Sequence, residues 1–267
     1  GTELGLGFAV HGIAKVGKDG ENEAGVLRKG GMTPGDVLVL TKPLGTGAVF
    51  AAHMRAKCKA RHVEEALQYM VMSNGAAGKL AAEWNTTVSD DGDVPISACT
   101  DITGFGLMGH LLEMVLGGDS KGTKVNVEID LKKVPFLTGA LRAATDGTFS
   151  SLQRENIRSR RAVSNHAAAE AADPVRYPLL YDPQTSGGLL FAVRPERAVR
   201  FVEALREKGY RAAVPIGRVV ASASAGSDDG EDESDDEQII GEGTCPAPDH
   251  RVRILLHHDY LKKFVNK

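Results

Sequence analysis

The sequence predicts an α+β protein in which a mixed β-sheet is covered by helices. Short apolar runs typical of buried strands recur along the chain, and amphipathic segments with helical spacing lie between them. The two kinds of segment do not alternate strictly, as they would in a doubly wound parallel sheet. With 267 residues, of which 42% are hydrophobic and 25% charged, the chain has the composition of a globular protein with a sizeable core.

The first elements are predicted from apolar periodicity. A strand over residues 4–16 is followed by a polar, glycine-rich loop over 17–34. The run DVLVL at residues 36–40 predicts a buried strand, after which TKPLGTG turns into a helix over 48–56. Apolar residues at steps of three and four then predict one longer helix over 62–84.

The middle of the chain continues the mixture of strands and helices. A strand is predicted over residues 94–99, a helix over 107–116 and an alternating strand over 124–129. Residues 137–175 are helical and polar. An apolar strand over 189–193 follows a tight turn.

The C-terminal part contains a helix over residues 195–209, with proline near its start and glycine just past its end. A strand over 212–220 follows. Residues 222–249 consist mainly of Ser, Gly, Asp, Glu and Pro, which favours a solvated, disordered insert because such a segment cannot bury a core. A last strand is predicted over 251–257.

The net charge of −3 conceals a mildly basic body. Residues 227–237 contain eight of the 35 acidic residues, and the rest of the chain has 27 acidic against 32 basic residues. Such a body suits a phosphate-bearing ligand. The basic residues are scattered without interleaved aromatic residues, and no apolar run approaches the roughly 20 residues that span a bilayer, so neither nucleic acid nor membrane is an expected partner. Ser227 and Ser234 lie among the acidic residues and are candidates for phosphorylation.

The three cysteines, Cys58, Cys99 and Cys245, lie far apart and form no C-x-x-C pair. This pattern excludes a disulfide framework and a zinc knuckle and indicates a reducing compartment, which predicts a cytoplasmic protein.

Residues 100–110, with the sequence TDITGFGLMGH, are the strongest candidate for a functional site. Asp101 lies in a loop that passes through three glycines into a helix. Mg²⁺ takes one or two protein carboxylates together with phosphate oxygens, and the amide groups of a helix start favour anions. The alternative is that Asp101 or Thr103 merely caps the helix. The spacing alone leaves both interpretations open.

The same letters also match the dinucleotide pattern G-x-G-x-x-G through Gly104, Gly106 and Gly109. A strand precedes the pattern, a helix follows it, and Glu128 and Asp130 lie about 20 residues further on. Against this interpretation, TDIT separates the strand from the first glycine, and no regular series of βα units follows. An NAD-binding domain of an oxidoreductase is therefore the first alternative function.

Three further motifs allow a functional and a structural interpretation. Gly45 and Gly47 in TKPLGTG allow backbone amides to face a phosphate, but a turn with a solvated Lys42 is slightly favoured. Asn74 lies on the apolar stripe of its predicted helix and is expected to tie a loop to the core. The segment DPQTSGG at residues 182–188 suits an anion-binding loop or an ordinary tight turn. His110 is expected to be a helix residue near the cap, and no acid–base pair is identified.

Together these motifs resemble those of selenophosphate synthetase. GDVLVLTKPLGTG, MSNGAAG, TDITGFGLMGHL and DPQTSGGLL occur in the family's order within residues 7–194. The resemblance implies the C-terminal domain fold of the aminoimidazole ribonucleotide synthetase-like superfamily. It also implies the reaction of ATP, selenide and water to selenophosphate, AMP and phosphate. Asp101 matches the family's metal-binding aspartate and would hold Mg²⁺, and Thr185, Ser186 and Gly187 would form a phosphate-facing loop.

The resemblance also implies a division of the chain. Residues 1–34 would be the end of a truncated N-terminal domain with a linker, and residues 35–267 the C-terminal domain with the acidic insert. The family's reactive Cys or selenocysteine, its nearby lysine and further metal-binding aspartates would precede residue 1. The chain alone would then contain no catalytic residue, be inactive and be monomeric, whereas the full-length enzyme would be a homodimer. A non-catalytic interaction module is the second alternative function.

The chain departs from the family at Arg154-Glu155-Asn156. Many members have a Gly-Gly-Thr…Arg-Asn pattern here, but this sequence has only Gly147 before Thr148 and carries an additional Glu155. A ligand role for Asn156 is therefore in doubt.

Overall fold

The computed structural model describes residues 9, 11, 26–86, 94–117, 124–222 and 252–255. The predicted strand over residues 4–16, the acidic stretch with Ser227 and Ser234, and Cys245 lie outside the described residues, apart from positions 9 and 11.

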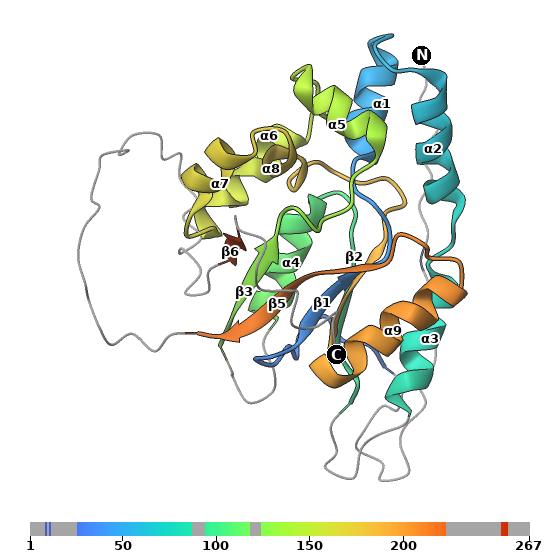
Figure 1. Cartoon of the computed structure of the whole chain (residues 1–267), viewed down its shortest axis with the longest axis vertical. Helices are drawn as coiled ribbons and strands as arrows, with labels where there is room; N and C mark the ends of the chain where they lie inside the picture. The colour runs from blue at the N-terminus through green and yellow to red at the C-terminus, as the bar shows by residue number, and fades with distance from the viewer. Residues whose placement is uncertain are drawn as a thin grey trace, which may run out of the picture.

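One mixed sheet organises the described part of the chain (Figure 1). Its six strands lie in the order β2-β4-β1-β5-β3-β6. Neighbouring strands are antiparallel except β3 and β6, which are parallel. The predicted mixed sheet is thereby confirmed. The strands are β1 (Val37–Leu40), β2 (Ile96–Asp101), β3 (Val125–Asp130), β4 (Leu189–Val193), β5 (Val214–Ala221) and β6 (Val252–Leu255).

Helices lie on both faces of this sheet and at one of its ends. The predicted polar helical region over residues 137–175 consists of several short helices. None of the helices in the described residues is long and apolar enough to cross a membrane. The helices are α1 (Thr46–Met54), α2 (Ala60–Val71), α3 (Gly75–Asn85), α4 (Gly106–Leu116), α5 (Thr138–Thr145), α6 (Gln153–Asn156), the 3₁₀ helix η1 (Ile157–Ala162), α7 (His166–Ala172), α8 (Arg176–Leu179) and α9 (Pro195–Glu207).

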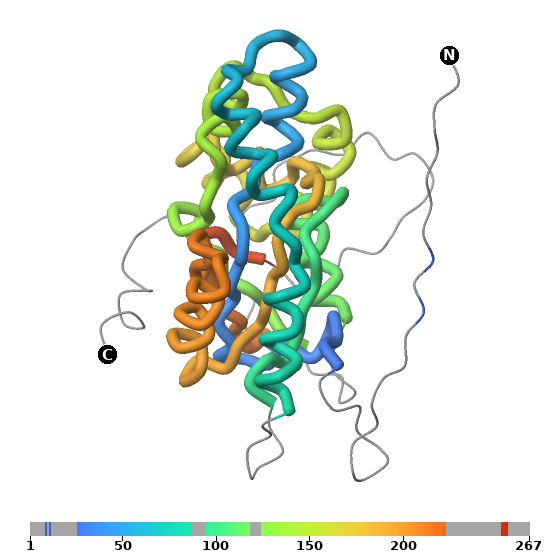
Figure 2. Tube along the Cα trace, turned by 90° about the vertical axis from the view of Figure 1, so that its right-hand side faces the viewer, coloured from blue at the N-terminus to red at the C-terminus, as the bar shows by residue number. Residues whose placement is uncertain are grey.

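The alternation of side chains along the strands divides the core between the two faces. Leu38 and Leu40 of β1 point to the face that packs against α4. Val37 and Val39 point to the opposite face and pack with residues of α3 and α9, the two helices on that face (Figure 2). A third apolar cluster joins α1, α2 and α5, which lie together beyond the end of the sheet (Figure 1).

The prediction of one helix over residues 62–84 is wrong, because the chain leaves the helix at Met72 and begins α3 at Gly75. The Met72 backbone is extended, and its carbonyl accepts a hydrogen bond from the Lys42 ammonium at 2.6 Å. The Ser73 carbonyl accepts one from the Tyr210 hydroxyl at 2.6 Å. These distant donors satisfy carbonyl groups that a continuous helix would have satisfied internally.

Candidate functional site

Two of the motifs lie side by side because β2 and β4 pair. In this antiparallel pair Asp101 lies opposite Leu189, and the Ile102 amide donates to the Gly188 carbonyl at 2.9 Å. The end of β2 thus runs along residues 182–188, which we call the motif loop. Segments more than 80 residues apart in sequence therefore lie side by side.

Gln184 of the motif loop connects it to two other motifs. Its side-chain oxygen accepts hydrogen bonds from the backbone amides of Gly45 at 2.7 Å and Thr46 at 3.1 Å. Its own side-chain amide donates to the Asp182 carbonyl at 2.8 Å, and its backbone amide donates to the Thr103 carbonyl at 2.9 Å. The Gly45 and Thr46 amides are therefore occupied by Gln184 and are not free to face a phosphate.

Lys42 and Asn74 hold the motif loop from the other side. Lys42 is only 2% exposed, and besides Met72 its ammonium donates to the Ser186 carbonyl at 3.1 Å. Burial lowers the pKa of Lys42. The expectation of a solvated lysine is wrong. The Asn74 side chain donates to the Gly187 carbonyl at 2.9 Å, which confirms its structural role.

A buried carboxyl group lies against the start of α1. Asp182 accepts a hydrogen bond from the Ser150 amide at 3.0 Å. Burial raises the pKa of Asp182 to about 6, while the amides of Ser150 and Ala48 act in the opposite direction. A Cβ atom at Gly47 would lie 2.6 Å from the second carboxyl oxygen, so glycine is required for this approach.

We expect the Asp182→Asn substitution to flatten the pH dependence of stability. The folded state binds the Asp182 proton more tightly than the unfolded chain, so stability falls as pH rises from about 4 to about 6 and is then level. This component is on the order of 2–3 kcal/mol. Urea denaturation at several pH values measures it. The exposed Asp146, changed to Asn, is the control, and equal pH slopes in wild type and Asp182→Asn would contradict the prediction.

Asp101 is exposed at the carboxyl end of β2, beside the motif loop. Among the described residues its carboxylate makes no hydrogen bond or ion pair. The residue that caps α4 is Phe105, with no side-chain cap, which contradicts the alternative that Asp101 or Thr103 caps this helix. The described residues contain no group of three or more His, Cys, Asp or Glu that could hold a metal. Asp101 is therefore suited to be one ligand of a site completed by other groups.

The predicted phosphate-facing residues have different surroundings. Thr185 and Ser186 are exposed, and their hydroxyl groups make no hydrogen bond within the described residues. The Thr185 amide donates to the Thr46 hydroxyl at 2.8 Å. Gly187 is buried against β2, where a Cβ atom would lie 2.0 Å from the Ile102 carbonyl oxygen. The hydroxyl groups, rather than Gly187, are the outward polar groups of the motif loop.

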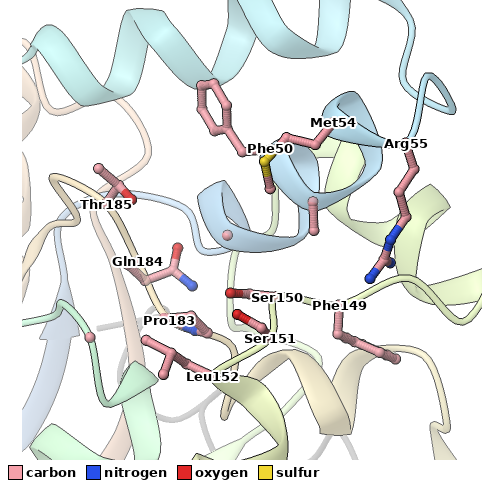
Figure 3. A pocket seen from close by; sticks show the side chains of 13 residues that line it. Phe50, Met54, Arg55, Phe149, Ser150, Ser151, Leu152, Pro183, Gln184 and Thr185 are labelled. Carbon is pink, nitrogen blue, oxygen red and sulfur yellow. The ribbon is translucent and has the colours of Figure 1, made fainter. Parts of the chain in front are cut away.

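A pocket of about 410 Å³ adjoins the motif loop (Figure 3). Thr185 and Gln184 line one side, and Met54 and Arg55 at the end of α1 line another. The segment over residues 149–152 completes the wall. The lining is mainly apolar, with the Arg55 guanidinium as its charged group.

The sheet topology contradicts the dinucleotide-binding alternative. A dinucleotide fold needs β2, α4 and β3 to form a parallel βαβ unit, but β2 is an edge strand and three strands separate it from β3. Gly106 has a φ of 68°, and a Cβ atom there would lie 2.8 Å from the Tyr181 carbonyl carbon. Glu128 forms an ion pair with Arg218 at 2.6 Å. Gly106 therefore serves the close packing of the chain against Tyr181, whereas a Cβ atom at Gly104 would meet nothing within 4 Å.

Two polar side chains near the site have partners that the sequence analysis did not predict. The Asn156 side chain donates to the carbonyl groups of Gly104 at 2.9 Å and Tyr181 at 3.0 Å, so its role is structural. His110, in α4 as expected, is only 5% exposed and contacts Thr103 and a carboxylate. The i,i+3 spacing of His110 and Glu113 was the available signal for this contact.

The chain is similar in sequence to curated selenide, water dikinases. The chain is 35% identical over 218 residues to the selenide, water dikinase of Geobacter metallireducens, covering 82% of this chain and 56% of that protein. It is 36% identical over 223 residues to the selenide, water dikinase of Geobacter sp. strain M21, covering 82% and 55%. The chain thus spans about half the length of the curated relatives it matches.

The solved structure of a hydrogenase maturation protein, HypE, aligns with 73% of this chain and 47% of that one at 17% identity, with a TM-score of 0.49. Residues 33–229 match the family model for the AIR synthase related protein, C-terminal domain. Because this match covers more than half of the sequence, the chain belongs to the family of AIR synthase related proteins and contains their C-terminal domain.

Proposed function

We propose that this chain is part of a cytoplasmic selenophosphate synthetase that converts ATP, selenide and water into selenophosphate, AMP and phosphate. Its similarity to curated selenide, water dikinases supports this assignment. The observation that carries it is the free Asp101 carboxylate beside the motif loop, where all four motifs of the resemblance meet. In this proposal residues 1–34 end an N-terminal domain and residues 35–267 form the C-terminal domain.

Asp101 fits the role of a Mg²⁺ ligand. Mg²⁺ prefers oxygen ligands and combines one or two carboxylates with phosphate oxygens, and Asp101 has an exposed carboxylate with no competing partner among the described residues. When bound, Mg²⁺ neutralises charge on the ATP phosphates during phosphoryl transfer. Beside it, the hydroxyl groups of Thr185 and Ser186 donate hydrogen bonds to phosphate oxygens.

The interior contacts of the motif loop would support this binding. Lys42 and Asn74 donate to the Ser186 and Gly187 carbonyl groups, and Gln184 of the loop accepts from Gly45. Two other segments, TKPLGTG and MSNGAAG, thus hold the loop. A loop fixed in this way loses little entropy when it receives a ligand, and its polar groups need no reorganisation. The buried residues therefore orient the exposed ones.

This chain alone is proposed to be inactive and monomeric. It supplies one carboxylate and matches only 56% of the length of the Geobacter metallireducens relative. The remaining ligands and the reactive Cys or selenocysteine would come from the other part of the longer protein, which would also form the homodimer.

The experiment that tests the proposal is the Asp101→Asn substitution in the full-length protein. We expect ATP-dependent selenophosphate formation to fall by at least about 100-fold, since the substitution removes a charge that acts on the transferring phosphate. The melting temperature should stay unchanged because the side chain is exposed. Glu83→Gln, at an exposed carboxylate on α3, should retain full activity. Full activity of Asp101→Asn would instead favour an interaction module.

A further inference from the structure

His110 connects Thr103, in the turn after Asp101, to the carboxylate of Glu113. Its Nε2 atom lies 3.1 Å from the Thr103 hydroxyl oxygen, and its Nδ1 atom lies 3.1 Å from the Glu113 carboxylate. The ring is buried and lies 5.5 Å from the ring of Phe105, which is itself exposed. The contact with Thr103 is thus partly shielded from water.

The hydrogen-bond directions follow from the chemistry of the partners. A carboxylate only accepts, so Nδ1 of His110 carries the proton and donates to Glu113. In the neutral ring Nε2 then accepts from the Thr103 hydroxyl. Burial raises the pKa of Glu113, but hydrogen bonds and charge from Lys29 and His110 outweigh it and leave this pKa below its usual value. Glu113 is therefore ionised at neutral pH.

Glu113 also binds the segment that leads into the domain, residues 26–31, which we call the entry segment. The Lys29 ammonium lies 2.7 Å from the same Glu113 oxygen. The Cys99 amide donates to the Arg28 carbonyl at 2.8 Å, so the entry segment runs along the edge of β2 opposite to β4. The strand that ends in Asp101 thus lies between β4 and the entry segment.

Thr103 is fixed from three directions. Its carbonyl accepts from the amides of Gln184 at 2.9 Å and Gly106 at 3.1 Å, and its hydroxyl bonds to His110. Asp101 lies two residues before Thr103. Its position therefore depends on the pairing of β2, which precedes it in the chain, and on the contacts of Thr103, which follows it. A ligand that must meet groups from elsewhere tolerates little displacement, since a shift of about 1 Å can cost about 100-fold in rate.

We propose that His110 is a positioning residue, which fixes the turn after Asp101 through Thr103 and ties this turn to the entry segment through Glu113 and Lys29. The proposal rests on the proposed role of Asp101 in binding the cation. His110 does not touch the reacting groups. It acts on the placement of the Asp101 carboxylate.

The test uses the full-length protein, with Mn²⁺ as the probe in the presence of a non-hydrolysable ATP analogue. Free Mn²⁺ is measured by electron paramagnetic resonance, which reports binding without turnover. We expect His110→Leu and Thr103→Val to weaken Mn²⁺ binding about 10-fold, as for other residues that orient a metal ligand. His110→Gln and Thr103→Ser keep hydrogen-bonding groups and should stay within about 3-fold of wild type.

The variants also separate positioning from stability. In His110→Leu and Thr103→Val, kcat should fall and the Mg²⁺ concentration for half-maximal activity should rise. The KM for ATP should change little. Lys29→Met should show a smaller loss in the same direction, and Lys79→Met, which removes another exposed ion pair, should show none. If His110→Leu fails to fold, the matched pair Thr103→Val and Thr103→Ser decides the question.

Wild-type Mn²⁺ affinity and activity in a folded Thr103→Val protein would overturn the proposal. So would equal losses in Thr103→Val and Thr103→Ser, because the hydroxyl group would then not be the cause. If Asp101→Asn itself leaves Mn²⁺ binding unchanged, the proposed function of Asp101 fails instead, and the two failures are distinguishable.

Discussion

Replacing Gly187 with alanine is expected to destabilise the protein by several kcal/mol, on the order of the largest effects of single substitutions. The added Cβ atom would lie 2.0 Å from the Ile102 carbonyl oxygen and 3.0 Å from Cβ of Gln184. Neither obstacle is the end of a flexible side chain, so the motif loop and β2 would have to separate. Urea denaturation of the chain would measure the loss of unfolding free energy.

Gly78 on α3 provides the matched control, since a Cβ atom there would meet nothing within 4 Å. Gly78→Ala should be neutral or stabilise by up to about 1 kcal/mol, because alanine favours the helix. A Gly187→Ala protein as stable as Gly78→Ala would show that β2 and the motif loop are not held together as described.

The second large effect is expected for Gln184→Leu. This substitution removes the acceptor of the Gly45 and Thr46 amides and the donor to the Asp182 carbonyl in a buried region. Each of these three buried groups left without a partner costs about 1–3 kcal/mol, so a total of roughly 3–9 kcal/mol is expected. The melting temperature and the urea midpoint of the variant would measure it.

Gln153→Leu makes the same chemical change at another buried glutamine, which donates one long bond of 3.4 Å to the Pro178 carbonyl. Its cost should be about 1 kcal/mol or less. Similar losses in the two variants would mean that Gln184 contributes through packing alone and that its contacts with α1 carry little energy.

The predicted strands that fall within the described residues agree with the structure to within a few residues, because buried strands require apolar runs that are visible in sequence. Residues 189–193 form β4 as predicted, and α4 begins one residue before the predicted helix. The break between α2 and α3 was not predictable from periodicity. It depends on donors from Lys42 and Tyr210, which lie 30 and 137 residues away from their acceptors.

The site was predicted only in outline. The motifs indicated Asp101 and the motif loop, and the exposed positions of Asp101, Thr185 and Ser186 agree with that prediction without testing it. The interior was missed because the environment of a polar side chain is set by tertiary contacts. The sequence TKPLGTG favoured a solvated Lys42, but the fold buries this side chain between the carbonyl groups of Met72 and Ser186.

The carboxyl group of Asp182 at the start of α1 has a further consequence. Helix starts attract anions, and at this one the Gly45 and Thr46 amides already donate to the Gln184 side chain, with the Asp182 carboxyl group beside them. The positive end of the α1 dipole therefore stabilises the fold. Its amides do not bind phosphate or sulfate from the medium. Under the proposed function, recognition of the nucleotide falls to Asp101, to the hydroxyl groups of Thr185 and Ser186, and to the rest of the longer protein.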